Sequence, residues 1–462
     1  MVSFPLRRLT LAVALAVTAS GARSETLDFK QCVAIALAQN PDMATAQSQI
    51  KQAEAAERQA RGNYWPKLNL SLTATRTNDA LNAFGLKLGQ RNATFGDFGA
   101  GEFNPSNPAV LSIAPHDLNY PGNVNNYNPR IELLVPVYNG GMVGDYVRQA
   151  KSYVQAAQAG DHLARQKLTE QVLMAYQGVH TARAYVEVAK QAQIAAEEYV
   201  RITSQLLKQG MSVKSDLLTA QVNLEDVKLK VTAAKNAEAD ALDQLHLLLG
   251  KPLAEPLDVG APVMPTMLDG DVTTLRREAL ANHQGLKALR SQEDSARAAV
   301  AAARAGNLPQ FNVMLRQDWN SKDLNTRAAS SYTVAGVLSW TAFDGGSSRA
   351  AVDRAEAQRL EIAAKLDQAN NGIAYKVGET KRQAEAAEET VKARKLALDE
   401  AVEAQRLVKK RYENGLGTLI ELLSAQAQLD KARADLVKAD YDQAVQRAEL
   451  KLAVGVLDAD KL

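Results

Sequence analysis

The sequence predicts a mainly α-helical protein with a membrane β-barrel contribution, in which a unit of helix, strand, strand, long helix and helix occurs twice. Three observations lead to this prediction. Distant segments of the chain repeat one another, stretches of more than sixty residues contain no proline, and short runs alternate between apolar and polar side chains. The composition agrees, because aromatic residues make up only 5% of the 462 residues, which suits long, closely packed helices better than a thick globular core.

The repeat appears when the two halves of the chain are aligned. The stretch "KQGMSVKSDLLTAQVNLEDVK" at 208–228 matches "ENGLGTLIELLSAQAQLDKAR" at 413–433. The same offset of 205 residues carries Gly140-Gly141 onto Gly345-Gly346. Such a fixed offset over a long stretch indicates duplication of one structural unit.

Upstream of these segments the offset changes to 243 residues, which places Pro66 on Pro309. The first copy therefore holds 38 extra residues. We predict a first structural repeat at 23–250 and a second at 271–462, joined by a Pro-rich linker at 251–270.

The first 22 residues are predicted to be a signal peptide. Arg7 and Arg8 precede a short apolar run, and Ser20-Gly21-Ala22 supplies the small residues of a cleavage site. The mature chain is therefore expected outside the cytoplasm. The single cysteine, Cys32, lies about ten residues beyond this site, which argues against a lipidated N-terminal cysteine and favours a buried, inert thiol.

The helices of both repeats are predicted from apolar periodicity and from the absence of proline. Asp28 is a suitable N-cap for the first of them. The long helices, about 68 residues each, are expected to extend about 100 Å. Rows at seven-residue spacing, such as Leu422, Leu429 and Leu436, predict coiled-coil packing. The predicted helices are 29–62, 142–209, 213–249, 272–305, 347–414 and 418–454.

The strands are predicted from alternation. In "KLNLSLTAT", Leu68, Leu70 and Leu72 alternate with polar residues, and the other runs have the same pattern. Between the first two strands, the segment 78–127 is rich in Gly, Asn and Pro and is predicted to be a long exposed loop. The predicted strands are about 67–77, 128–138, 309–319 and 331–341.

The sheet formed by the four predicted strands can be interpreted in two ways. A half-buried sheet in a soluble domain is one of them. The signal peptide and the polar second face favour the other, a membrane barrel, because no segment after the signal is apolar enough to be a membrane helix. Four strands are too few to close a membrane barrel, so a barrel must be shared between several chains.

Several function classes are excluded by the residue patterns. The net charge of +2, with acidic and basic residues well mixed, argues against nucleic-acid binding. The five histidines have no metal-ligand spacing, and no nucleotide-binding or hydrolase motif occurs. We therefore expect no enzyme activity, no metal, no cofactor and no nucleic-acid partner.

The signal peptide, the duplicated plan, the corners "PVYNGG" and "WTAFDGG" and the two glycine turns together resemble the outer-membrane efflux protein (TolC-like) family. The likeness covers nearly the whole mature chain. It implies a homotrimer in the bacterial outer membrane, in contact with outer-membrane lipid, in which each chain gives four strands to one trimeric 12-stranded barrel on a long periplasmic α-helical coiled-coil tunnel. It also implies two partners, a periplasmic adaptor (membrane fusion) protein and an inner-membrane efflux pump.

The resemblance implies roles for particular residues. In family members, carboxylates after the second glycine turn narrow the channel aperture. Glu421 matches the first of these positions. Ser424 stands where a second carboxylate often occurs. Asp216 and Tyr412 match positions that help lock the closed state by hydrogen bonds between neighbouring coils. Gly417 replaces a basic partner found in some relatives, so this lock is expected to be weaker. Each of these side chains also has a structural interpretation, as a solvated charge or a ring packed on the coil.

The glycine positions are expected to be structural, because glycine tolerates sharp changes of chain direction. The resemblance adds adaptor docking at the helical tips, which are Gly210, Met211, Gly415, Leu416 and Gly417. The strand-to-helix corners are Gly140, Gly141, Gly345 and Gly346.

We therefore predict the outer-membrane exit channel of a tripartite efflux pump, which passively conducts small molecules such as drugs or metal ions from the adaptor and pump to the outside. Two alternatives stay open. One is the exit duct of a type I protein secretion system. The other is a structural trimeric coiled coil or surface adhesin without transport.

Overall fold

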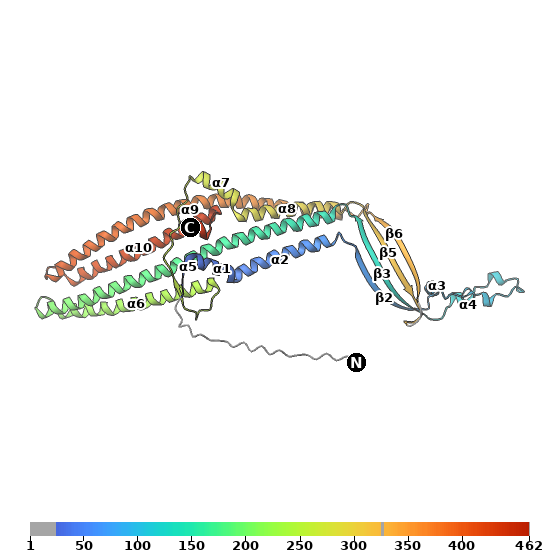
Figure 1. Ribbon diagram of the computed structural model, residues 1–462, viewed down its shortest axis with the longest axis horizontal. Coiled ribbons are helices and arrows are strands. Elements are labelled where there is room, and N and C mark those ends of the chain that lie inside the picture. Colours follow the sequence, from blue (N-terminus) through green and yellow to red (C-terminus); the bar gives the residue numbers. More distant parts are fainter. Residues whose placement is uncertain (1–24, 325–327, 462) are drawn as a thin grey trace, which may run out of the picture. The chain divides into compact units, whose positions relative to one another are not determined.

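The computed structural model describes residues 25–324 and 328–461 (Figure 1), so the predicted signal peptide lies outside the described residues. The chain forms two compact units. Among these residues, unit 1 comprises 25–46, 161–284 and 370–461, and unit 2 comprises 47–160, 285–324 and 328–369. Each unit draws on both sequence repeats, so the compact units cut across the repeat boundaries predicted from the sequence.

Two helices of 67 residues each, α5 (Met142–Lys208) and α9 (Ser347–Glu413), contribute to both units. They lie where the sequence predicts the two long helices, and each corresponds to about 100 Å of helix. Each is followed by a turn and a helix of 36 residues, α6 (Lys214–Leu249) and α10 (Leu419–Val454).

Unit 2 contains an antiparallel sheet of four strands, which Figure 1 shows side by side. Their order is β2 (Lys67–Thr77), β3 (Val124–Tyr138), β5 (Gln310–Asn320) and β6 (Ala329–Ser339). The hairpins β2–β3 and β5–β6 thus pair with each other through β3 and β5, one from each sequence repeat.

The register of the sheet places the alternating apolar residues on one face. Leu68 lies opposite Leu133, Leu133 opposite Leu315, and Leu315 opposite Val334, so one apolar row crosses all four strands. Because successive side chains of a strand point to opposite faces, the polar residues between them share the other face.

The segment between β2 and β3 has more regular structure than the predicted loop at 78–127. β3 begins at Val124, four residues earlier than predicted. Asp79 caps the first helix of the segment, since its Oδ1 accepts a hydrogen bond of 2.9 Å from the Asn82 amide. The elements are α3 (Ala80–Gly89), η1 (Phe95–Phe98), η2 (Ala100–Glu102), η3 (Val110–Ser112) and α4 (His116–Asn119).

The helices predicted as unbroken at 29–62 and 272–305 are each divided in two, which corrects both predictions. The first becomes α1 (Phe29–Gln39) and α2 (Pro41–Gly62), and the second α7 (Val272–Asn282) and α8 (Gln284–Ala305). At the first break, Asn40 is extended, with φ −65° and ψ 131°, because the following proline disfavours the helical conformation.

No proline follows the second break, at His283. Both breaks share another feature, which is that each packs against a glycine. Gly455 ends α10 with φ 82°, and a Cβ on it would lie 2.9 Å from the His283 Cα. Gly250 ends α6 with φ 68°, and a Cβ there would lie 2.9 Å from the Gln39 carbonyl oxygen. Each broken helix therefore lies directly against the glycine cap of a returning helix, which only glycine can provide at this distance.

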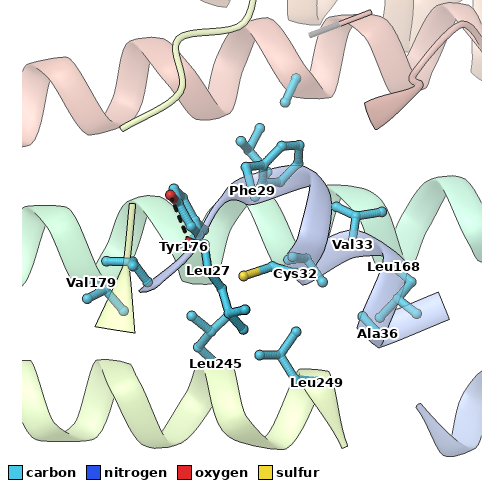
Figure 2. Packing of buried hydrophobic residues seen from close by; sticks show 14 of the residues in the cluster. Leu27, Phe29, Cys32, Val33, Ala36, Leu168, Tyr176, Val179, Leu245 and Leu249 are labelled. Atoms are coloured by element: carbon cyan, nitrogen blue, oxygen red, sulfur yellow. Dashed lines mark hydrogen bonds between the residues drawn. The ribbon is translucent and has the colours of Figure 1, made fainter. Parts of the chain in front are cut away.

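The largest apolar cluster of unit 1 surrounds α1. Figure 2 shows Phe29 and Cys32 of α1 beside Tyr176 of α5 and Leu249 of α6. Cys32 is fully buried, and burial raises the pKa of its thiol to about 12, as expected for an inert core residue. The structure adds elements that the sequence analysis did not predict, a parallel pair β1 (Glu25–Leu27) and β4 (Leu257–Val259) and the short helix η4 (Ala459–Lys461).

Candidate functional site

The two long helices end in the same kind of turn. After α5, the Gly210 amide donates to the Leu207 carbonyl at 3.1 Å and the Met211 amide to the Leu206 carbonyl at 2.9 Å. The same pair of bonds closes α9, with Gly415 in the place of Gly210. Both glycines have positive φ, 77° and 70°, which is the usual glycine cap of a helix C-terminus.

The predicted docking residues of the two turns lie together. The Met211 Sδ is 3.7 Å from the point that a Cβ on Gly415 would occupy. The apolar side chains around this contact face solvent, with Leu416 73% and Ile420 77% exposed. A pair of neighbouring turns with exposed apolar side chains has the character of a protein contact site.

Glu421, the predicted aperture carboxylate, is exposed and forms a capping box with Thr418 at the start of α10. The Thr418 amide donates to Glu421 Oε2 at 3.1 Å, and the Glu421 amide donates to Thr418 Oγ1 at 3.2 Å. A Cβ on Gly417 would lie 3.3 Å from the same Oε2. Glu421 thus has a local role in starting the helix, and Ser424 is exposed on the same helix.

Tyr412 and Asp216, the predicted lock residues, have different partners. Tyr412 is buried, and its hydroxyl lies 2.8 Å from Thr203 Oγ1, which connects α9 to α5 within the chain. Asp216 is half-buried in the first turn of α6 and accepts a 3.1 Å hydrogen bond from the Ser212 hydroxyl. The structure therefore places Tyr412 in a tie between helices and Asp216 in its own turn.

A second buried polar tie was missed by the sequence analysis. The Tyr199 hydroxyl of α5 donates to Gln426 Oε1 of α10 at 2.5 Å, and Gln405 Nε2 of α9 donates to the Tyr199 oxygen at 2.6 Å. Gln426 Nε2 in turn donates to Asp430 Oδ1 at 2.8 Å. Burial raises the pKa of Tyr199 to about 12 and also raises the pKa of Asp430. A signal was available in the sequence, because Gln426 lies one helical turn from Leu422 and from Leu429, which belong to a predicted packing row.

The two faces of the sheet differ in chemistry. The apolar face is open, with Leu70 71% and Tyr332 80% exposed. On the other face Asp318 is buried and accepts a hydrogen bond from Arg130 Nε at 2.7 Å, and Arg316 Nε lies 2.8 Å from its second oxygen. The sheet thus exposes apolar side chains on one face and holds the ion-paired Asp318 on the opposite face.

The predicted corners between strand and helix have left-handed glycines. Gly140 and Gly141 have φ values of 65° and 86°, and Gly345 and Gly346 have 70° and 91°. The surroundings of the two corners differ. A Cβ on Gly140 would lie 2.9 Å from the Ala305 carbonyl oxygen, whereas nothing lies within 4 Å of the corresponding point on Gly345.

Within 25–324 and 328–461, no three His, Cys, Asp or Glu side chains are grouped so that they could hold a metal ion. Among the described helices, none is both long enough and apolar enough to cross a membrane.

Comparison with known proteins places these features in context. The sequence profile described as "Outer membrane efflux protein" matches residues 33–251 and 275–456. Both matched segments include a long helix, its glycine turn and the strands before it.

Individual relatives are more distant. Protein CyaE of Bordetella pertussis is 28% identical over 419 residues, which covers 89% of this chain and 80% of that protein. The alkaline protease secretion protein AprF of Pseudomonas aeruginosa is 26% identical over 322 residues, covering 68% of this chain and 67% of the relative. The crystal structure of the Campylobacter jejuni CmeC outer membrane channel has a similar fold, with a TM-score of 0.77 at 17% identity, covering 99% of this chain and 96% of that chain.

Proposed function

Because the chain belongs to the outer membrane efflux protein family, we propose that it is the exit channel of a tripartite transport system, located in the bacterial outer membrane with a large periplasmic portion. The observation that carries this proposal is the sheet of unit 2. Its apolar face is exposed, while its opposite face holds the buried Asp318 carboxylate, which pairs with Arg130 and Arg316. An apolar outer face and a polar inner face are what a membrane barrel around a water-filled lumen requires.

The proposed assembly is a homotrimer. In the described residues, β2 and β6 are the edges of the sheet and have no strand on their outer sides. Unpaired edges are unfavourable in a membrane, because their backbone groups cannot hydrogen-bond to water there. Edge pairing between copies satisfies these groups, and three copies give the twelve strands that the family resemblance implies.

The helices form the proposed periplasmic tunnel. About 100 Å of helix in α5 and in α9 suits a duct that reaches deep into the periplasm. The exposed residues Met211, Leu416 and Ile420 at the turns supply the apolar surface on which the periplasmic adaptor docks. The adaptor joins the channel to the inner-membrane pump, and the channel itself conducts passively.

Glu421 and Ser424 line the proposed aperture. Three Glu421 carboxylates around a threefold axis repel one another and favour cations in the narrow mouth. The capping box supports this role, because it fixes the carboxylate at the start of α10. Tyr412 and Asp216 hold the closed state in this proposal, Tyr412 through the buried tie to Thr203.

The proposed cargo is a small molecule, such as a drug or a metal ion, in keeping with the efflux function in the family description. The second candidate cargo is a secreted protein, because one relative that matches 68% of this chain is named an alkaline protease secretion protein. Removing the gene from the source bacterium separates the two. Increased sensitivity to small toxic compounds supports efflux, whereas loss of particular proteins from the culture medium supports secretion.

The channel itself is tested by planar-bilayer recording on the full-length protein. We expect a cation-selective conductance, reduced in selectivity by Glu421→Gln, which removes the charge but keeps a capping side chain. Ser424→Asp adds a second acidic ring and is expected to increase the selectivity. Protein that is monomeric and soluble without detergent, with no conductance in any variant, contradicts the channel and favours a structural coiled coil or adhesin.

A further inference from the structure

The segment between β2 and β3, residues 78–123, is named here the distal loop. It contains 46 residues, against eight in the corresponding connection between β5 and β6. Figure 1 shows α3 and α4 of this loop beyond the ends of the strands. Loops of this length inside a compact unit usually have a function of their own.

Several side chains of the distal loop bind one another within the loop. Lys87 Nζ lies 2.5 Å from Asp97 Oδ1, and the rings of Phe84 and Phe98 meet edge to face at 4.8 Å. Glu102 accepts hydrogen bonds from two backbone amides at the start of α4, at 2.7 and 2.9 Å. These contacts connect different segments of the loop and give Lys87, Asp97 and Glu102 partners within it.

The base of the distal loop is fixed to the sheet. The buried Gln90 side chain donates to the Asn125 carbonyl at 2.7 Å and to Asn126 Oδ1 at 3.0 Å, and Asn126 donates onward to Asn320 of β5 at 2.9 Å. Arg91 reaches the Ser330 carbonyl of β6 at 2.9 Å. The loop is thus tied across the ends of β3, β5 and β6, so little conformational freedom remains to be lost when it makes further contacts.

The distal loop has protruding apolar side chains on its outer surface. Phe95 is 86% and Leu111 92% exposed. Leu111 also lines a groove of about 410 Å³, whose other walls include Glu102 and the apolar residues Phe98, Phe103, Val110, Ile113 and Pro115. Protruding apolar side chains next to a mainly apolar groove are characteristic of an interaction surface.

The position of the loop indicates what covers this surface. The loop begins where β2 ends, and β2 is an edge of the sheet that has no outer partner among the described residues. In the trimer of the proposed function, on which this inference rests, the next copy pairs along that edge. We propose that the distal loops of neighbouring copies pack against one another through Phe95, Leu111 and the groove, and form an apolar collar around the channel exit.

The test uses full-length protein purified in detergent, with Leu111→Asp compared with Ser106→Asp, an exposed polar position in the same loop. Leu111 is almost fully exposed in the single chain, so the change is not expected to prevent folding. We expect Leu111→Asp to lower the temperature at which the trimer dissociates by several degrees and Ser106→Asp to leave it unchanged. Equal dissociation temperatures for Leu111→Asp and wild type overturn the collar. A wild-type protein that is never trimeric overturns the proposed function instead.

Thiol cross-linking gives a second readout that does not depend on stability. In a Cys32→Ala background, Leu111→Cys is expected to give covalent dimers with a short bifunctional maleimide, and Lys322→Cys, exposed in the short β5–β6 connection, is expected to give far fewer. Trimers that lack a Leu111→Cys cross-link contradict contact between loops. If Leu111→Asp also weakens binding to phospholipid vesicles without changing trimer stability, the loop faces lipid and the collar is wrong.

Discussion

The hydroxyl of Tyr412 lies 2.8 Å from Thr203 Oγ1, and both residues are buried. Tyr412 belongs to α9 and Thr203 to α5, so this hydrogen bond connects helices from the two sequence repeats near their glycine turns. A movement that separates the turns must break this bond or carry both helices together. The tie is therefore a defined element whose removal should favour a wider aperture in the proposed channel.

Removing the Tyr412 hydroxyl should weaken the closed arrangement. Tyr412→Phe leaves Thr203 without this partner, and we expect a loss of about 1 kcal/mol of stability. We also expect a higher open probability in bilayer recordings. Combining it with Thr203→Val should cost less than the sum of the single changes, since both remove the same bond.

Tyr375→Phe is the matched control, because Tyr375 is an exposed tyrosine on the same helix. It should change neither stability nor conductance. If Tyr412→Phe behaves like this control in both measurements, the buried bond does not hold the closed state.

The Tyr199–Gln426 tie should also matter, and the duplication supplies its control. Gln426→Leu leaves the buried Tyr199 hydroxyl without its acceptor, which we expect to cost about 1–3 kcal/mol in thermal or denaturant unfolding. Gln221 is the repeat counterpart of Gln426 and is exposed, so Gln221→Leu should have little effect. Equal effects of the two substitutions contradict a role for burial and hydrogen bonding at Gln426.

The order of elements could be predicted from the sequence because it depends on local patterns. Helix α5 is visible as a long proline-free stretch, and the apolar row through Leu68, Leu133, Leu315 and Val334 follows from alternation in each strand. The break at Asn40 had a signal in Pro41 that the helical periodicity obscured. The break at His283 has no proline of its own, but the offset of 243 residues carries Asn40 onto His283, so the repeat offered a signal there as well. The close approach of Gly455, a residue more than 170 positions away, had no local signal.

Less of the candidate site than of the element order could be predicted from the sequence. The exposed turn residues followed from the repeat and the family resemblance, but the partners of Tyr412 and Tyr199 did not. Thr203 and Gln405 meet these tyrosines only because α5 and α9 lie at a particular rotation and height relative to each other. Seven-residue spacing identifies which face of a helix packs, but it does not identify which polar residues of two helices meet there.

The strand-to-helix corners offer a comparison between two glycines with similar backbone and different surroundings. Gly140 and Gly345 have φ values of 65° and 70°, so alanine at either position should cost about 1 kcal/mol for the left-handed conformation alone. Only at Gly140 does the new Cβ come within 2.9 Å of Ala305 and Leu308 atoms. We therefore expect Gly140→Ala to be the more destabilising by about 1–3 kcal/mol, measured by thermal unfolding. Equal losses at the two corners contradict the close contact.

The stability of unit 1 should depend on pH through Glu170 of α5. Burial first, and then the charge of Glu449, raise the pKa of Glu170 from an ordinary value of 4.5 to about 7, although Lys167 and Lys376 partly oppose the shift. The folded protein therefore binds a proton that the unfolded chain releases at lower pH, so stability should fall as the pH rises between these two values. Thermal unfolding from pH 4.5 to 8 measures this slope, which Glu170→Gln should flatten.

Glu449→Gln distinguishes the two causes of the pKa shift. It removes the neighbouring charge but leaves Glu170 buried, so the slope of stability against pH should become smaller without disappearing. A slope that is unchanged in Glu170→Gln assigns the pH dependence to another group. A slope that disappears in Glu449→Gln makes repulsion between the two carboxylates, rather than burial, the main cause. Glu170 would then be expected to ionise at its ordinary pH once Glu449 is neutral, which titration of the Glu449→Gln protein by NMR of labelled glutamate measures directly.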